Sequence, residues 1–242
     1  MFTYVKKLSK IIAVVITAII ISLAFIYAKY SRIDFGKTFG PKAIAAEHKL
    51  TTMQDNFNLC SKLCSADVKF MQGIIFPELM RYNSLKDGVE AESLRTLYVQ
   101  LGSAYANFSI GLFQMKPTFA VQVEMKATQL LPDNILKELQ LQYKSTGEEA
   151  VRMERVERLQ DDDWQMVYLT AFVAICNKLY QYKNFSSATE KLQWYATVYN
   201  AGFDKTDAYI SNKIKQDNFY LSQDMPGKKF KYAAIAGWFY NK

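Results

Sequence analysis

Apolar residues recur at helical spacing along most of this 242-residue chain, and this pattern limits the folds open to it. It is strongest over residues 57–75, 164–182 and 188–201, where apolar side chains three or four positions apart would share one face of a helix. Few segments alternate between apolar and polar residues, as a half-buried strand requires. The sequence therefore predicts an all-α fold, and a chain of this length can bury a substantial core.

The amino-terminal part has a separate character. Residues 11–28 are uncharged and mostly apolar, and they lie between Lys10 and Lys29. As a helix they would reach roughly 27 Å, close to the thickness of a hydrocarbon core. The preceding lysines place the amino terminus in the cytoplasm. We expect a single-pass inner-membrane anchor over residues 1–30, with the rest in the periplasm. A cleaved signal peptide is the alternative, although residues 26–28 make a poor small-x-small cleavage site.

Composition then indicates how the remainder is organised. Gly36, Gly40 and Pro41 predict a short linker over residues 31–43, followed by one domain over residues 44–242. The formal charge of the whole chain is +7, but four of the 30 lysines and arginines lie within residues 1–30, where no acidic residue is present. The remaining charge is small and forms no basic stripe with interleaved aromatic residues. Nucleic acid is therefore not an expected partner, whereas an anionic polymer such as the cell wall is compatible with this charge.

Cysteine and histidine usage offers little support for a metal site. Cys60 and Cys64 lie one helical turn apart, Cys176 is distant, and no Cys-x-x-Cys pair accompanies His48, the single histidine. One disulfide with a leftover thiol and three buried thiols both remain open. We expect neither a metal nor a cofactor.

Residues 106–117 fit neither a helical stripe nor a strand alternation, because Ser109, Gly111 and Gln114 interrupt the apolar residues irregularly. Gly111 permits unusual backbone angles or the close approach of a ligand, and Gln114 can both donate and accept hydrogen bonds. These features predict a structured loop that suits a ligand rich in amides and hydroxyls. A buried turn between two helices is the simpler interpretation of such a segment taken alone.

Glu78 follows Pro77 at the end of an apolar helix. Because proline disfavours helix in the preceding residue, the helix should kink or restart here. Burial would disfavour the charged form of Glu78, raise its pKa and suit it to act as a general acid. Stabilisation at a helix N-terminus, or pairing with Arg81, would lower the pKa instead, and the residues alone favour this simpler interpretation.

Three short motifs occur in a fixed order: Glu78, then Gly-Leu-Phe-Gln at residues 111–114 with Pro117, then Val-Tyr-Asn-Ala-Gly at residues 198–202. Together they resemble the soluble lytic transglycosylase family. The pattern of that family is a catalytic glutamate at the end of an apolar helix, a Gly-Leu-Met-Gln loop followed by proline, and Ala-Tyr-Asn-Ala-Gly. The resemblance covers residues 67–202 and implies a mainly helical, lysozyme-like fold.

The resemblance also implies a site and a reaction. Glu78 would be the acid/base, Ser109 and Gln114 would face the glycan, and Tyr199 and Asn200 would complete the substrate site. The partner would be peptidoglycan glycan strands, cleaved between N-acetylmuramic acid and N-acetylglucosamine to leave a 1,6-anhydro end. The N-acetyl group of the substrate would stabilise the developing cation, so one carboxyl group suffices.

The chain departs from the family pattern near the glutamate. Leu79 follows Glu78 where the family usually has serine, and Glu92-Ser93 restores that dipeptide, which makes Glu92 a rival acid. Glu92 belongs to a polar run, however, and Glu78 follows the required apolar helix. The span from Glu78 to Gly111 is longer than the resemblance to the family leads us to expect. It therefore implies an inserted helix over or beside the groove. A catalytically inactive lysozyme-like module that binds glycan or scaffolds an envelope complex is the alternative function.

Overall fold

The computed structural model describes residues 16–22, 34–221, 225 and 227–242, and the chain divides into two units, Met1–Gly40 and Pro41–Lys242. In the first unit, residues 16–22 are helical. Among the described residues, no helix is both long and apolar enough to cross a membrane. The predicted anchor over residues 11–28 lies mostly outside them, so it stays a prediction.

Helix α2, Phe35–Thr52, begins inside the segment that was predicted as a linker. Asp34 starts it by accepting a hydrogen bond from the Lys37 amide at 3.1 Å. At Gly40 the backbone leaves helical geometry, with φ 29° and ψ −109°, and Pro41 follows. A proline fits there because the first turn of a helix does not use its amide. The segment is thus helical from Phe35 onward with one break, and its role as a linker stays a prediction.

The second unit is built almost entirely of helices, so the prediction of a mainly helical domain is confirmed. They are α3 Gln54–Cys64, α4 Val68–Arg81, α5 Ser84–Ser93, the π-helical segment η1 Leu94–Tyr98, α6 Val99–Leu101, α7 Pro117–Leu130, α8 Asp133–Leu139, α9 Glu148–Gln160, α10 Asp162–Leu179, α11 Ala188–Ala201, α12 Asp207–Ile214 and α13 Tyr232–Tyr240. Between α12 and α13, β1 Phe219–Tyr220 pairs antiparallel with β2 Lys229–Phe230.

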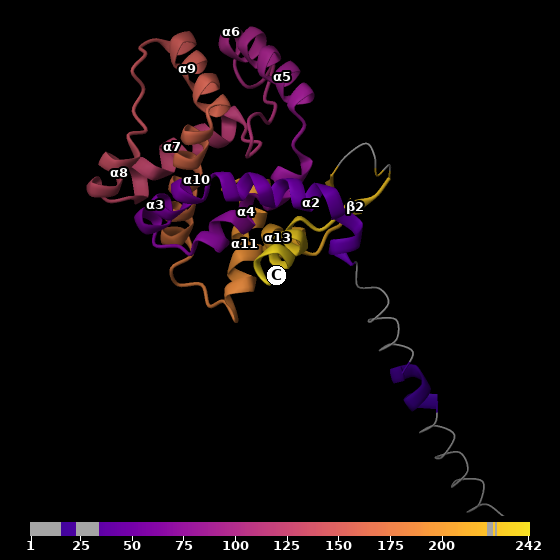
Figure 1. The fold of residues 1–242 in the computed structure, drawn as a ribbon. Helices are drawn as coiled ribbons and strands as arrows, with labels where there is room; N and C mark the ends of the chain where they lie inside the picture. Colours follow the sequence, from indigo (N-terminus) through magenta and orange to yellow (C-terminus); the bar gives the residue numbers. More distant parts are fainter. Residues whose placement is uncertain (1–15, 23–33, 222–224, 226) are drawn as a thin grey trace, which may run out of the picture. The chain divides into compact units, whose positions relative to one another are not determined.

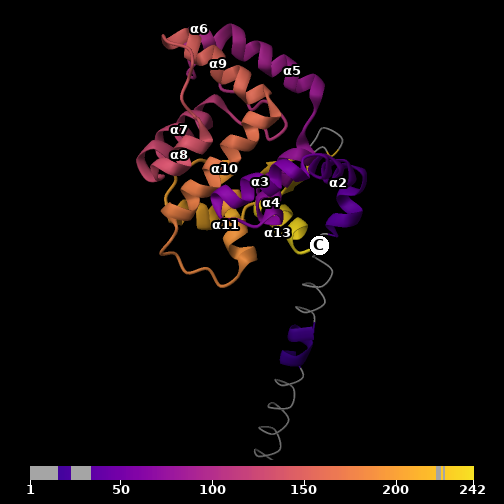
Figure 2. The same cartoon turned by 60° about the vertical axis from the view of Figure 1, so that its left-hand side comes forward.

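Helix α4 lies at the centre of this unit and packs against α3, α10, α11 and α13. Every residue from Phe70 to Met80 is buried. Gly73 allows the close approach of α11, because a Cβ atom there would lie 2.9 Å from a methyl group of Leu192. Figures 1 and 2 both show α4, α11 and α13 on one side of the unit and α5, α6 and the start of α9 on the other, with α10 between them.

The course of α4 differs from the sequence-based prediction in two ways. The helix predicted over residues 57–75 is two helices, because Ser65 adopts a left-handed conformation with φ 52° and Asp67 caps α4 by accepting from the amides of Lys69 and Phe70. A kink or a restart was predicted at Pro77; the restart is wrong, since α4 continues to Arg81, and the kink stays a prediction. An interior proline costs about 3 kcal/mol, whereas each large apolar side chain that α4 buries contributes about 1.5–3 kcal/mol. Tertiary packing therefore outweighs the lost hydrogen bond.

Helix α5 begins in a polar segment, where Asn83 accepts a hydrogen bond from the Lys86 amide at 3.1 Å. Helix α6 ends at Leu101, and Gly102 follows with φ 85°. Helix α12 and the β1–β2 hairpin were not predicted. All three cysteines are free thiols, so the disulfide that the sequence left open is absent; Cys64 and Cys176 are buried, whereas Cys60 is only half-buried.

Candidate active site

A cleft of about 340 Å³ opens where the end of α4 meets the 107–116 loop, the start of α7 and the end of α11. Four segments that are distant in sequence therefore form its walls. The five residues predicted from the sequence all line it: Glu78, Ser109, Gln114, Tyr199 and Asn200. The rival Glu92 is not among the lining residues; its side chain is 70% exposed on α5 and pairs with Arg95. The structure thus brings the predicted residues together, while their roles remain predictions.

Glu78 lies in the last turn of α4, and its side chain is only 4% exposed. Arg81, three residues later on the same helix, places Nη2 2.7 Å from Oε2 of Glu78. The contact is not an aligned hydrogen bond. Within the described part of the chain, Glu78 Oε2 and Arg81 Nε both lack a hydrogen-bond partner. The carboxyl group is therefore buried beside one cation and faces the cleft.

Both influences anticipated for Glu78 act on it. Burial raises the pKa of Glu78 and is the largest effect. The positive charge of Arg81, the nearby polar side chains of Asn200 and Tyr232, and the charge of Lys116 oppose this shift. The pKa of Glu78 remains above its usual value, so the carboxyl group keeps its proton to a higher pH than an exposed glutamate does. This is the property that a general acid needs.

The 110–115 segment is a tight hairpin-like turn. The amides of Ile110 and Met115 each donate to the other's carbonyl, at 2.9 and 3.0 Å, and the Gln114 amide donates to the Gly111 carbonyl at 3.0 Å. Gly111 has φ 72° and Gln114 has φ 53°, both in the left-handed region. Phe113 is fully buried beneath the turn. The segment is thus both the structured loop and the buried turn that the sequence suggested.

Gln165 of α10, which sequence reasoning missed, fixes this turn from below. It is fully buried, donates to the carbonyls of Ile110 and Leu159 at 3.0 and 2.5 Å, and accepts from the Phe113 amide at 2.6 Å. A Cβ atom on Gly111 would lie 1.6 Å from Gln165 Nε2, so glycine is required there. A lone glutamine among the apolar residues of α10 was the available signal.

Gln114 is held from the other side by Asp87 of α5. Its Nε2 donates to Asp87 Oδ1 at 3.1 Å and to the Gly111 carbonyl at 2.9 Å, and the Gly111 amide donates to the same Asp87 oxygen at 2.7 Å. The hydrogen bonds found within the described residues engage only Nε2 of the Gln114 side chain. Gln114 therefore presents Oε1 as an acceptor for a hydroxyl or amide in the cleft.

Tyr199 joins α11 to the loop. Its hydroxyl donates to the Phe113 carbonyl at 2.7 Å, and its ring packs edge-on against Phe119 at 5.0 Å and Phe172 at 5.3 Å between centroids. Burial and the negative charge of Glu78 raise the pKa of Tyr199. The Tyr199 hydroxyl proton is thus used in a hydrogen bond within the protein. The neighbouring Asn200 side chain, in contrast, interacts with Glu78.

The C-terminal region, which the sequence motifs left unexplained, also reaches the site. Tyr232 at the start of α13 is buried, donates to the Ile74 carbonyl at 3.0 Å and interacts with Glu78. Lys205, which also lines the cleft, pairs with Asp204 at 2.8 Å, and this contact lowers the pKa of Asp204. Lys116 also lines the cleft and has no ion pair with any described residue.

Comparison with known proteins finds no relative. No protein-family model, no curated protein and no solved structure matches the chain. The fold and the cleft by themselves define a mainly helical domain in which one buried carboxyl group faces a polar cleft.

Proposed function

We propose that this protein is a peptidoglycan lytic transglycosylase with Glu78 as its single acid/base. One observation carries the proposal: three motifs that resemble that family, separated by up to 120 residues, contribute side chains to one cleft around a buried glutamate. A lysozyme-like fold, a periplasmic location and a membrane anchor over residues 1–30 belong to the same proposal.

In the proposed reaction, Glu78 donates its proton to the leaving glycosidic oxygen. The N-acetyl group of the substrate stabilises the developing cation, and the Glu78 carboxylate then removes the proton from the C6 hydroxyl, whose oxygen closes the 1,6-anhydro ring. The cleft suits a mechanism with one acid. Its lining contains a second carboxyl group, Asp204, but pairing with Lys205 lowers the pKa of that group and keeps it ionised.

The surrounding groups have separate roles in this proposal. Gln114 Oε1 and the side chains of Ser109 and Asn200 offer hydrogen bonds to the hydroxyl and N-acetyl groups of the sugar. Tyr199 acts indirectly, because its hydroxyl holds the loop that carries Gln114. Polar groups that converge on one cleft are typical of a ligand-binding site.

The test is incubation of the purified full-length protein with isolated sacculi, followed by mass spectrometry of the released muropeptides. The wild type is expected to release products with 1,6-anhydro ends, and Glu78→Gln is expected to abolish release, whereas Glu92→Gln is expected to keep it. Products with reducing ends would instead indicate a hydrolase. Absence of any product from the wild type would contradict the proposal.

The alternative is a catalytically inactive module that binds glycan. The contact between Arg81 and Glu78 favours it, because a nearby cation stabilises the charged carboxylate and not the acid. Leu79 in place of the family serine favours it as well. Binding to sacculi in a pull-down, without bond cleavage, would support this alternative.

A further inference from the structure

The contact between Arg81 and Glu78 is an unusual ion pair. Although Nη2 and Oε2 are 2.7 Å apart, Oε2 of Glu78 and Nε of Arg81 make no hydrogen bond to any described residue. The Glu78 side chain is 4% exposed and that of Arg81 is 31% exposed. Removing a carboxylate from water is costly, and an ion pair repays that cost only when hydrogen bonds satisfy its remaining buried atoms. The pair of Arg81 and Glu78 lacks these hydrogen bonds, so we do not attribute its presence to a contribution to the stability of the fold.

Arg81 makes a second contact, with an aromatic ring. The guanidinium carbon of Arg81 lies 5.2 Å from the centre of the Phe219 ring, within range of a cation–π interaction. Phe219 belongs to β1 and is 3% exposed. It pairs with Phe230 of β2, and its ring packs edge-on against Tyr232, with centroids 4.9 Å apart. The C-terminal hairpin thus supports Arg81 from a rigid aromatic surface.

The same aromatic cluster reaches the carboxyl group. Tyr232 interacts with Glu78 and is anchored by its hydrogen bond to the Ile74 carbonyl. Arg81 therefore contacts both Glu78 and the Phe219 ring. The charged and titratable groups that face Glu78 are Arg81 of α4, Lys116 ahead of α7, Tyr199 of α11 and Tyr232 of α13.

We propose that Arg81, held by Phe219 of the C-terminal hairpin, is a positioning residue that orients the Glu78 carboxyl group and sets the pH range over which it can donate a proton. The role in proton donation rests on the proposed function, whereas control of the ionisation of Glu78 does not. The hairpin and α13, which lie outside the family-like motifs, thereby become part of the site.

The sign of the effect follows from the charge. Arg81 favours the ionised form of Glu78, so its removal raises the pKa of Glu78, and a neighbouring cation typically changes a carboxyl pKa by about 1–3 units. A general acid loses activity as the pH rises through its pKa. The high-pH limb of kcat/KM is therefore expected to move upward by about 1–3 pH units in Arg81→Met. Methionine keeps an apolar stem in the same space.

The experiment uses the full-length protein and five variants, of which Arg81→Met is the first. Arg81→Lys keeps the charge and is expected to keep the limb within about 0.5 pH units of the wild type. Phe219→Leu keeps the apolar contact but removes the ring, and is expected to move the limb upward by less than about one pH unit. Arg95→Met is the matched control, because Arg95 and Glu92 form an exposed ion pair three residues apart. Glu78→Gln lacks the Glu78 carboxyl group and therefore identifies the NMR signal of that group in the titration described below.

A ¹³C NMR titration of the Glu78 carboxyl carbon gives the same information without turnover. The proposal is supported if the pKa of Glu78 is higher in Arg81→Met than in the wild type, and if it stays close to the wild-type value in both Arg81→Lys and Arg95→Met. An unchanged or lower pKa in Arg81→Met overturns it, as does the same shift in Arg95→Met. If the wild type cleaves no glycan but the titration moves as expected, the proposed function fails and the role of Arg81 in ionisation stands. If Arg81→Met does not fold, the Phe219→Leu variant provides the test. An upward shift of the high-pH limb in that variant supports the proposal, and no shift or a downward shift overturns it.

Discussion

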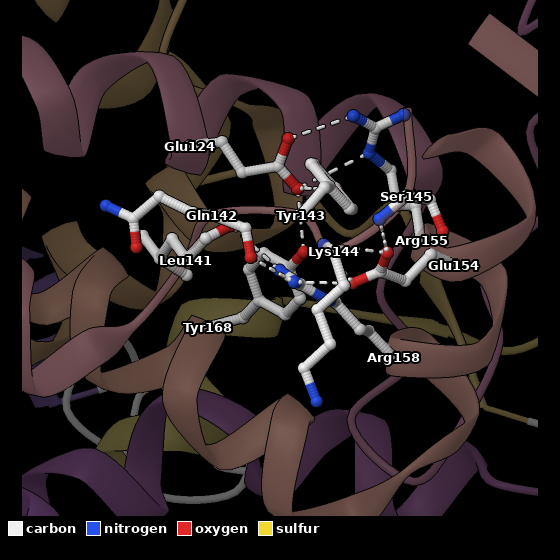
Figure 3. A network of polar contacts seen from close by, with 10 residues as sticks. All are labelled: Glu124, Leu141, Gln142, Tyr143, Lys144, Ser145, Glu154, Arg155, Arg158 and Tyr168. Carbon is white, nitrogen blue, oxygen red and sulfur yellow. Dashed lines mark hydrogen bonds and ion pairs between the residues drawn. The ribbon is translucent and has the colours of Figure 1, made fainter. Parts of the chain in front are cut away.

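Two Glu–Arg pairs in this domain differ in burial and in hydrogen bonding: the side chains of Arg155 and Glu124 are 9% and 16% exposed, and those of Arg81 and Glu78 are 31% and 4% exposed. In the first, Arg155 contacts both oxygens of Glu124, at 3.3 and 3.0 Å, and donates from Nη1 to the Tyr98 hydroxyl at 2.6 Å. Glu124 also accepts hydrogen bonds from the hydroxyls of Tyr143 and Tyr168, as Figure 3 shows. In the second, Arg81 meets Glu78 through one contact, and one atom of each residue has no hydrogen-bond partner among the described residues.

The difference separates two uses of a buried carboxylate. The network around Glu124 connects α7, α9 and α10 with the segment between α8 and α9, and it extends to Glu154 and Arg158 (Figure 3). Such a network specifies packing, because each polar group loses its partner if the helices move. The pair at Glu78 connects two residues of one helix and opens onto the cleft. An incompletely satisfied carboxyl group beside a cleft is the arrangement expected for chemistry, not for stability.

The largest expected effect is on activity at Glu78. Glu78→Gln removes the only proton donor proposed for the cleft, and loss of a general acid typically costs about 10²–10⁴-fold in rate. Release of anhydro-muropeptides from sacculi measures the loss. Glu92→Gln, which removes an exposed carboxylate, is the control with an unchanged rate. Equal rates in Glu78→Gln and the wild type would remove Glu78 from the mechanism.

The converse effect is on stability at Glu124. Glu124→Gln leaves Arg155 buried without a countercharge, and breaking such a pair costs about 3–5 kcal/mol. Urea unfolding measures the loss of free energy of unfolding. Glu78→Gln should lose much less, because a carboxyl group with a raised pKa is already poorly stabilised in its charged form. Equal losses in the two variants would erase the proposed difference between the pairs.

A third expected effect concerns Gln165, which is satisfied like Glu124 but lies beneath the cleft. Gln165→Ala removes the hydrogen bonds to the 110–115 turn and leaves the Phe113 amide unpaired, at a cost of about 1–3 kcal/mol. Because Gln114 is carried by that turn, KM for glycan should also rise. Thermal unfolding and KM measured on the same preparation test the two parts. A normal KM with reduced stability would show that the turn does not position substrate.

The smallest expected effect is a pH dependence in the outer part of the network. Hydrogen bonds from the backbone amides of Ser145 and Lys144, with Arg158, lower the pKa of Glu154 from 4.5 to about 2. A carboxyl group with a lowered pKa stabilises the fold above 4.5, and this contribution disappears as the pH falls toward 2. Glu154→Gln should therefore lower stability by about 1 kcal/mol at pH 7 and by nothing near pH 2. Urea unfolding across this pH range measures the difference, and a pH-independent difference would contradict the assignment.

The sequence alone determined those features that depend on local chemistry. It predicted a helix over residues 188–201, which matches α11. It also named five residues that line one cleft, because the three motifs could be identified from residue type and order. Gly111 was singled out for its conformational freedom, and its positive φ confirms that freedom.

Only the tertiary structure decided what depends on contacts between distant segments. Helix α4 continues through Pro77 because it packs against α3, α10, α11 and α13. Rules based on neighbouring residues do not include that packing energy. The hydrogen bond between Gln165 and Phe113 joins residues 52 positions apart, and the one between Tyr232 and Ile74 joins residues 158 positions apart. For Glu78 the sequence offered two opposite pKa shifts, by burial and by Arg81. The structure contains both, and burial prevails because the fold removes the carboxyl group from water more completely than one poorly aligned cation can compensate.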